Sequence, residues 1–425
     1  MPELAATPST ALSFDTSASN AVARSRIQSI DVLRGIVMVI MALDHVRDFF
    51  YKPDVLPGNA AGVALDPTNL ATTTPILFFT RWITHFCAPI FVFLAGTSIF
   101  LMGRKKTKGE LSAFLLKRGI FLVLVEAIII TFGWRFDPLY HIVILQVIWA
   151  IGICMILFGL LIFLPYQAIF VLGLLIVFGH NILDFKSVSA GLKGGDLSNL
   201  LYFSNFSQLP SDPNLHPTHF AIIVYAFGPW LGVMLLGYCF GKLYDGSMDP
   251  ARRKKMLIQL GLAITLLFII LRLINKYGDP VPWSQQDRGT IFSFLSFFNL
   301  NKYPPSLLFL CMTIGPGILL LALLENVQNW FTRIMNVYGR VPMFYYILHF
   351  YIIHTLIVIV FFAEGHPSSE MWAPDMLFYF RPASLGFGLP GVYAIWLFVV
   401  IVLYPLCKMY DRYKSTHRQW WLSYL

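Results

Sequence analysis

The sequence predicts an all-α fold, a polytopic membrane bundle of about ten transmembrane helices with both termini in the cytoplasm. The first observation is composition, since 57% of the 425 residues are hydrophobic and only 12% are charged. A mean hydropathy of +0.68 exceeds what a soluble domain needs for its core. The second observation is that long apolar segments recur along the whole chain. The third is that basic residues gather in alternate loops between those segments.

The apolar segments define the expected helices in chain order. The spans are expected near residues 30–51, 75–102, 112–134, 140–164, 166–183, 219–243, 256–275, 305–325, 340–363 and 390–410. Residues 1–28 are rich in Ala, Ser and Thr and lack the apolar core of a signal peptide. We therefore expect a disordered cytoplasmic tail over residues 1–28 and a single transmembrane domain over residues 29–425.

Lys and Arg residues set the expected orientation. RKKTK at 104–108 and ARRKK at 251–255 fall on one side of the bundle, together with Arg340 and the basic C-terminal segment. Cytoplasmic loops carry such an excess of positive charge, so this side is predicted to be cytoplasmic. The membrane also accounts for the net charge of +9 without nucleic acid as a partner.

The loops on the opposite, outer side are longer and different in composition. They cover residues 52–74, 184–218, 276–304 and 364–389 and are rich in Pro, Asn, Asp and aromatic residues. Loops of this length commonly bind ligands or act as lids. We expect the recognition surface on this side.

The sequence gives no sign of a metal centre or a disulfide framework. The cysteines form no CxxC pair, and all lie in or beside apolar spans: Cys87, Cys154, Cys239, Cys311 and Cys407. We expect them to be small buried hydrophobic residues. No Walker loop, GxGxxG, HExxH or GxSxG motif is present.

The first span carries the strongest functional signal. Asp31, Arg34, Asp44, His45 and Asp48 fall within an arc of about 140° when the segment is drawn as a helix. Charged side chains inside a membrane persist only with partners or in a wet cavity. These residues form two polar stations on the helix. Arg34 lies in the one near the first end, and the one around His45 lies roughly 15 Å further along. Two polar stations near opposite membrane faces indicate a functional site.

His45 is the predicted catalytic residue of this span. It is adjacent to Asp44 and three positions before Asp48. A carboxylate that accepts a hydrogen bond from one imidazole nitrogen raises the basicity of the other, as a general base requires. The alternative is a structural Asp–His–Arg network that ties helices together.

The second and third spans add two candidates. His85 follows Arg81 by one turn near the outer side, so His85 and His45 could face one cavity. A capped interfacial histidine is the alternative. Glu126 lies near the midplane of the third span, where a carboxylate needs a partner such as Arg34 or His349. Structural and functional roles are equally compatible with it.

The eighth and ninth spans add three more. His349 follows Tyr345 by one turn, which fits either a substrate-lining face or a histidine that bonds across helices. Lys302, in NKYPPS at the start of the eighth span, could meet an anionic group or act as an interfacial anchor.

Four stretches together resemble one family. They are SIDVLRGIVMVIMALDHVRDFF (29–50), RWITHFCAPIFVFLAGTSIF (81–100), the pair GDPVPW (278–283) and NKYPPSLLF (301–309), and YGRVPMFYYILHF (338–350) with the terminal RQWWLSYL (418–425). The chain resembles the bacterial membrane proteins grouped with the heparan-α-glucosaminide N-acetyltransferase catalytic domain. The likeness extends from residue 26 to residue 425.

The resemblance implies acyl transfer across a membrane. In the characterised branch, acetyl-CoA binds from the cytosolic side and the acetyl group reaches a glucosamine amine on the far side. The essential histidine of that branch lies in the loop after its first span, and residues 52–74 contain no histidine here. Only the site region therefore carries over, and His45 and His85 are inferred from depth and chemistry.

The predicted function is transfer of an acetyl or other acyl group from cytoplasmic acyl-CoA to a sugar amine or hydroxyl at the periplasmic face of a bacterial inner membrane. His45 would act as base or acyl carrier, Asp44 or Asp48 would orient it, and His85 would assist. The predicted acyl-CoA contacts are Arg34, Glu126, His349 and Tyr345. No metal is expected.

The expected partners are the lipid bilayer and a glycan or glycolipid acceptor, and a homodimer is left open. The rival prediction is a proton-coupled transporter in which the same Asp, His and Glu groups relay protons.

Overall fold

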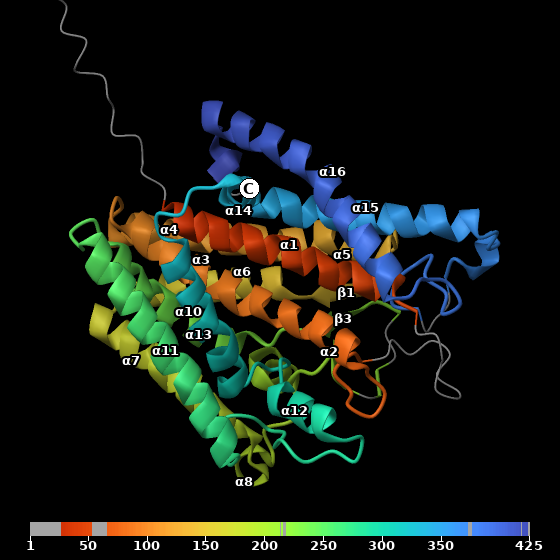
Figure 1. Cartoon of the computed structure of the whole chain (residues 1–425), viewed down its shortest axis with the longest axis horizontal. Helices are drawn as coiled ribbons and strands as arrows, with labels where there is room; N and C mark the ends of the chain where they lie inside the picture. Colours follow the sequence, from red (N-terminus) through yellow and green to blue (C-terminus); the bar gives the residue numbers. More distant parts are fainter. Residues whose placement is uncertain are drawn as a thin grey trace, which may run out of the picture.

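The computed structural model describes residues 27–52, 66–212, 214–215, 218–372, 376–417 and 419–423. Within them, a bundle of helices gathers around α1 (Gln28–Phe50), which runs through the middle of the molecule in Figure 1. Helices α3, α13, α14, α15 and α16 pack against α1, with the bounds given below. The predicted tail lies outside the described residues except for its last two positions.

The remaining main helices follow in chain order. They are α2 (Pro75–Trp82), α3 (Cys87–Gly103), α4 (Lys108–Leu124), α5 (Thr131–Arg135), α6 (Val147–Leu161), α7 (Tyr166–Gly179), α10 (Phe227–Phe240), α11 (Pro250–Ile274), α12 (Thr290–Phe298), α13 (Leu307–Leu324), α14 (Trp330–Arg340), α15 (Pro342–Ala363) and α16 (Leu389–Thr416). A 3₁₀ turn, η2 (Ile83–Phe86), joins α2 to α3, and a π-helical turn, η3 (Val125–Ile130), joins α4 to α5. Short helical pieces in the loops and at helix ends are α8 (Lys186–Ser189), α9 (Asp196–Ser198), η4 (His180–Asp184), η5 (Asn199–Phe203), η6 (Gly241–Tyr244), η7 (Ser368–Glu370) and η8 (Trp420–Ser423).

Within the described ranges, six helical segments are long and apolar enough to cross a membrane. They are Pro75–Gly103, Tyr166–Asp184, Pro250–Ile274, Leu307–Leu324, Pro342–Ala363 and Leu389–Thr416. Each coincides with a predicted span. The predicted span 30–51 coincides with α1, which is long but highly charged, and 112–134 changes helix type at η3. The number ten and the sides on which the termini lie therefore stay predictions.

Local signals in the sequence determine where several helices begin. Thr107 and Glu110 form a reciprocal capping box at the start of α4. Asp249 caps α11, and Pro250 occupies its first turn, where a missing N–H costs nothing. Ser306 accepts a hydrogen bond from the backbone N–H of Phe309 and so starts α13 directly after the long loop over residues 276–304.

A small sheet departs from the all-α prediction. Strands β1 (Ile142–Leu145), β2 (Ser207–Leu209) and β3 (Phe220–Ile223) pair in the order β1-β3-β2. β1 and β3 are parallel, and β2 is antiparallel to β3. The predicted spans 140–164 and 219–243 thus begin as strands. Short apolar runs such as IVIL and FAII cannot be assigned to strand or helix from periodicity alone.

Glycines allow α1 and α14 to cross with their backbones in contact. A Cβ atom on Gly35 would overlap the carbonyl oxygen of Met335, and one on Gly339 would overlap that of Asp31. Small residues at such crossings are how membrane helices approach closely, because lipid is as apolar as a leucine side chain. The crossing fixes α1, and with it the residues that α1 carries.

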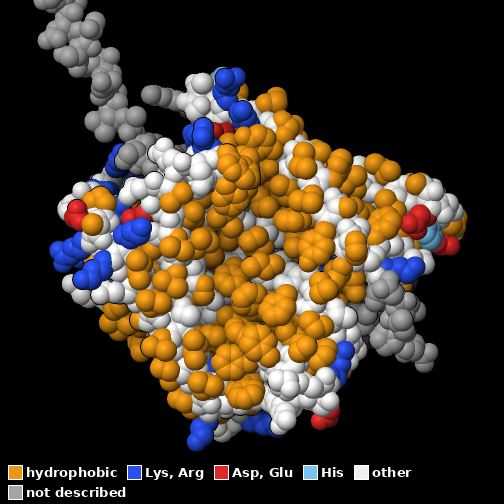
Figure 2. All heavy atoms as spheres, viewed as in Figure 1, with side chains coloured by type: hydrophobic (Ala, Val, Ile, Leu, Met, Phe, Trp, Pro, Cys, Tyr) orange, Lys and Arg blue, Asp and Glu red, His pale blue; other side chains and the backbone are white. Residues whose placement is uncertain are grey.

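Apolar side chains cover the outside of the bundle. Leu175 on α7, Leu266 on α11 and Ile401 on α16 are each more than half exposed. Figure 2 shows hydrophobic side chains over most of the visible face, with Lys and Arg gathered at its margins. Such a surface is an aggregation liability in water and the expected surface in lipid.

Candidate active site

A cavity of about 660 Å³ lies beside the C-terminal half of α1. All four long loops contribute to its wall, through residues 66–68, 205–206, 299–303 and 377–378. The predicted loop 52–74 is described from residue 66 onward. A cavity of this volume is in the usual range for a small-molecule site. The ends of β1 and β3 add Gln146 and Tyr225 to the lining.

Four charged side chains form a compact network on one wall of the cavity. Arg47 donates to Asp48 Oδ1 at 2.6 Å. Arg47 Nη1 also lies 2.7 Å from Asp44 Oδ1, an ion pair whose angle does not make it a hydrogen bond. Arg81, from α2, pairs with the other oxygen of Asp44. Two carboxylates and two guanidinium groups thus neutralise one another where an unpaired charge would be costly.

His45 is held by a second histidine and not by the expected carboxylates. Its Nδ1 lies 2.6 Å from Nε2 of His349 on α15. Nδ1 of His349 in turn lies 3.1 Å from the carbonyl oxygen of Tyr345. The orienting hydrogen bond that we expected from Asp44 or Asp48 therefore comes from His349.

The two hydrogen bonds determine which nitrogen of His45 is free. A carbonyl oxygen only accepts, so Nδ1 of His349 carries a proton. Neutral His349 then has its lone pair on Nε2 and accepts from the Nδ1–H of His45. The lone pair of His45 is left on Nε2, for which the described residues supply no hydrogen-bond partner. His45 thus presents an unprotonated nitrogen at the cavity wall.

Two aromatic rings pack against the imidazole of His45. Phe350 stacks on it at 4.4 Å between ring centroids, and Trp134 meets it edge-on at 5.1 Å. Both rings are buried. They fix the plane of the imidazole and exclude water from its back, which strengthens its hydrogen bond to His349.

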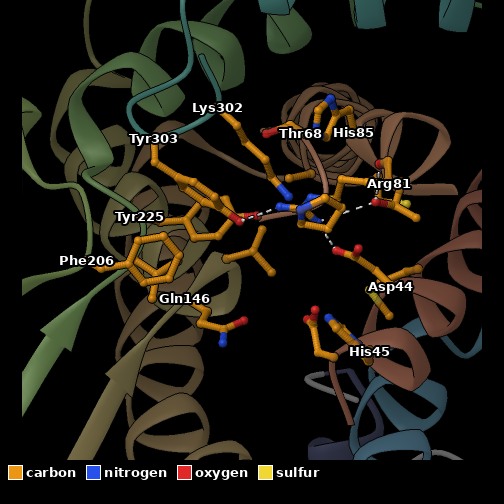
Figure 3. Close-up of a pocket in the computed structure, with 18 of the residues that line it drawn as sticks. Asp44, His45, Thr68, Arg81, His85, Gln146, Phe206, Tyr225, Lys302 and Tyr303 are labelled. Atoms are coloured by element: carbon orange, nitrogen blue, oxygen red, sulfur yellow. Dashed lines mark hydrogen bonds and ion pairs between the residues drawn. The ribbon is translucent and has the colours of Figure 1, made fainter. Parts of the chain in front are cut away.

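Asp279 ties the two loop motifs GDPVPW and NKYPPS together. Its Oδ2 accepts hydrogen bonds from the backbone N–H of Asn301 at 2.9 Å and from the hydroxyl of Ser306 at 2.6 Å. This tie brings Lys302 and Tyr303 to the cavity wall across from His45 (Figure 3). Lys302 is only 8% exposed there, so the interfacial-anchor alternative does not fit it.

The wall around Tyr303 has a positive potential. Arg81 donates a hydrogen bond to the Tyr303 hydroxyl at 3.4 Å. Burial alone would raise the pKa of Tyr303, but the charges of Lys302 and Arg81 outweigh it and hold that pKa below its ordinary value.

His85, on η2, lines the same cavity as His45. It is 2% exposed, and its Nδ1 has no hydrogen-bond partner among the described residues. Its ring packs against Phe309 at 5.3 Å between centroids. A buried ring nitrogen beside a cavity is available to a ligand.

Arg34, an expected acyl-CoA contact, lies away from this cavity. It pairs with Asp31 at 2.9 Å and donates to the Gly339 carbonyl at 3.2 Å and to the Ser98 hydroxyl at 3.3 Å. These bonds connect α1 to α14 and α3 beside the glycine crossing. They give Arg34 a structural role in the described chain.

The other expected acyl-CoA contacts do not line the cavity either. Glu126 is fully buried on η3 and accepts a hydrogen bond from the backbone N–H of Trp149 at 3.0 Å, so neither Arg34 nor His349 is its partner. Tyr345 is fully buried and stacks on His349 at 5.6 Å between centroids. Tyr345 thus supports the histidine pair, and Glu126 connects η3 to α6.

Two lining residues had no clear signal in the sequence. Gln146 is an isolated amide within an apolar run, and this isolation was the only available indication. Tyr225 looks like one of many aromatic residues in a span. Both reach the cavity because the parallel strands β1 and β3 end side by side, where the backbone N–H of Tyr225 donates to the carbonyl of Leu145 at 3.2 Å.

No group of three or more His, Cys, Asp or Glu side chains within the described ranges is arranged to hold a metal ion. The five cysteines are free and buried. The cavity wall carries imidazole, carboxylate, guanidinium, ammonium and phenol groups.

Comparison with protein families gives a match that covers the first part of the chain. Residues 26–272 match the family model described as Heparan-alpha-glucosaminide N-acetyltransferase, catalytic. The match covers more than half of the chain, from before α1 to near the end of α11. It includes His45, Arg81 and His85 and ends before Lys302 and His349. No curated protein matches the chain.

Proposed function

The chain belongs to the heparan-α-glucosaminide N-acetyltransferase catalytic family, a family of membrane acetyltransferase-like proteins, and from this we propose a specific reaction. The protein would transfer an acetyl or other acyl group from cytoplasmic acyl-CoA to a sugar amine or hydroxyl at the outer face of a bacterial inner membrane. The observation that carries the proposal is His45 in the wall of a cavity large enough for a sugar, with an Nε2 for which the described residues supply no hydrogen-bond partner.

A general base at this position suits acyl transfer. The acceptor amine or hydroxyl must lose a proton as its nitrogen or oxygen attacks the thioester carbonyl. Nε2 of His45 would take that proton, and the positive charge that results would be shared through Nδ1–H with His349. The proton would then pass to the departing CoA thiolate, which balances the reaction.

The charged network beside His45 supports the same chemistry. Asp44 lies next to His45 in the chain and would stabilise an imidazolium through space, while Arg47 and Arg81 keep the carboxylate in place. His85 is available as a second contact for the acceptor. The donor part of the proposal relies on the family alone, because Arg34, Glu126 and Tyr345 do not line the cavity.

The test is transfer by the purified protein in lipid vesicles. Acetyl-CoA and glucosamine would be supplied, and both the acetylated sugar and the released CoA thiol would be measured. We expect His45→Gln to lower the rate by about 10²–10⁴-fold, the usual contribution of a general base. His219→Gln is the matched control, because His219 is exposed and lies outside the cavity lining.

Two outcomes would overturn the proposal. One is a folded, inserted His45→Gln protein with full transfer activity. The other is wild-type protein that releases no CoA with any acyl donor, yet moves a sugar across the membrane in response to a proton gradient. The second result would establish the transporter alternative.

A further inference from the structure

Lys302 carries a charge that the described protein does not neutralise. The ammonium group lies 5.1 Å from the ring centroid of Tyr303 and 5.9 Å from that of Tyr225. No carboxylate in the described ranges forms an ion pair with it. Cation–π contacts at these distances are weak compared with the hydration that a buried ammonium gives up. Lys302 therefore lacks a partner that a ligand could supply.

The carboxylates near the cavity are engaged elsewhere. Those on the wall of His45 are paired with arginines, as described above. Asp66 is exposed, and its Oδ1 accepts hydrogen bonds from the backbone N–H and the hydroxyl of Thr68 at 2.9 and 2.7 Å. Among the described residues, Lys302 is thus left without an ion-pair partner, because the Asp44 carboxylate acts on it only through space and is itself paired with Arg47 and Arg81.

Other groups around Lys302 also favour an anion. Figure 3 shows the Lys302 side chain extending toward Arg81 and the hydroxyl of Tyr303. The lowered pKa of Tyr303, described above, reports the same positive potential. The unpartnered Nδ1 of His85 lies in the same cavity wall and offers a further hydrogen bond.

We propose that Lys302, assisted by the Tyr303 hydroxyl and Arg81, forms a subsite for one anionic group of the acceptor. The group is a carboxylate or a phosphate on the sugar that is acylated. A lysine ammonium is a compact point charge without the fork of an arginine, which suits one oxyanion. The inference rests on the proposed function, because it assigns the cavity to the acceptor.

The positions of Lys302 and His45 indicate how the acceptor would lie in the cavity. Its anionic group would meet Lys302, and its reacting amine or hydroxyl would meet His45. Lys302 comes from a long loop that we predict to lie on the outer side, whereas His45 lies deeper on a helix. An acceptor held by its anion at Lys302 would turn its amine or hydroxyl toward His45. The subsite would therefore select among sugars without taking part in proton transfer.

The test measures binding without an acyl donor. Detergent-purified protein would be titrated with glucosamine 6-phosphate and glucosamine, and separately with glucuronate and glucose, at constant ionic strength. The first pair isolates a phosphate and the second a carboxylate, so the two pairs distinguish the sources of the charge. The variants are Lys302→Met, Lys302→Arg and Lys242→Met. Lys242 is the matched control, because its ammonium lies 5.1 Å from the Tyr166 ring but outside the cavity lining.

We expect wild-type protein to bind at least one anionic sugar about tenfold or more tightly than its uncharged partner, as a desolvated charge contact should give. Lys302→Met should remove that preference, Lys302→Arg should keep most of it, and Lys242→Met should leave it unchanged. A matching thermal unfolding midpoint would confirm that Lys302→Met is folded.

The inference is overturned if wild-type protein shows no preference for either anion, or if folded Lys302→Met keeps the preference. Because no acyl donor is present, the result is independent of catalysis. Anion binding without transfer would contradict only the proposed function. Transfer without an anion preference would contradict only the subsite.

Discussion

His45 depends on a residue more than three hundred positions away in the chain. The carbonyl of Tyr345 fixes the proton of His349 on Nδ1, and His349 then fixes the proton of His45 on Nδ1. The first step uses the fact that a carbonyl oxygen only accepts, and the second uses the fact that a neutral imidazole has one protonated and one unprotonated nitrogen. His349 is thus a positioning residue, and His45 is the residue that would touch the acceptor.

Replacing His349 should separate catalysis from binding. His349→Phe removes the acceptor for the Nδ1–H of His45, so we expect kcat to fall by about 100-fold with little change in KM for the sugar. His349→Gln keeps an oxygen that can accept this hydrogen bond and should recover part of the lost rate. Steady-state kinetics of both variants in vesicles would measure the difference.

A purely structural role for His349 gives another pattern. In that case both variants would lose folded protein, and the remaining fraction would have wild-type kcat. Active-site titration of the folded fraction distinguishes the two cases. Equal kcat in the two variants, after this correction, would rule out the positioning role.

Some residues of the site could be found from sequence and others could not. Asp44, His45 and Asp48 were predictable because charge inside an apolar span is costly and rarely accidental. The link from His45 to His349 was not, because two spans far apart in sequence meet only in the folded bundle. Lys302 was recognised as a candidate, but its burial and lack of an ion-pair partner are properties of the fold.

At the scale of elements, the loop that carries Lys302 is held by one buried carboxylate. Burial raises the pKa of Asp279, hydrogen bonds from Ser306 and Asn301 lower it, and the net pKa lies above its ordinary value. A group with a raised folded pKa disfavours the folded state once it is ionised. Ionised Asp279 therefore lowers the free energy of unfolding, and its protonation would raise it.

The pH dependence of stability should reveal this effect. Lowering the pH through the folded pKa of Asp279 protonates it and stabilises wild-type protein, whereas Asp279→Asn cannot titrate there. We expect Tm of wild type minus Tm of Asp279→Asn to increase as the pH falls from 7 to 4. Thermal unfolding of both proteins at one scan rate measures it.

The subtraction is itself the control, since other titrating groups are common to both proteins. A difference that is flat or that decreases toward pH 4 would contradict the raised pKa. Asp279→Ala should also lose anion binding while its helical circular dichroism stays unchanged. This result would further support the role of Asp279 in placing Lys302.

The sequence predicted secondary structure poorly where a predicted helical span begins as a strand or contains a π turn. Most long helices follow directly from apolar length. The runs IVIL and FAII became strands because they pair with each other across the cavity wall, a choice made by tertiary contacts. The π turn at Glu126 likewise has no signature in the local sequence.

At the scale of the whole molecule, the orientation in the membrane remains the main prediction from charge. Its test is labelling of single introduced cysteines with a maleimide that does not cross membranes. The five native cysteines are buried, so the background should be low. In intact cells we expect Asp287→Cys to be labelled and Ser247→Cys to be labelled only after permeabilisation, because these exposed positions lie in an outer and an inner loop.

The reverse labelling pattern would invert the orientation and would place the cavity loops toward the cytoplasm. Labelling of both positions in intact cells would indicate leaky membranes, which a cytosolic marker protein detects. The fold, the cavity and the histidine pair are unaffected by either result.

The cavity is built from two kinds of chain segment that tolerate change differently. His45 lies on a helix that crosses α14 through paired glycines, so almost any added atom there would displace it. Lys302 lies on a loop between helices, and loops accept substitutions and insertions far more readily than helices in backbone contact do. If the protein acts as we propose, its descendants could therefore change the acceptor through substitutions in the loops alone, while His45 and its helix stay the same. Engineering of a new acceptor specificity could likewise be confined to the loops.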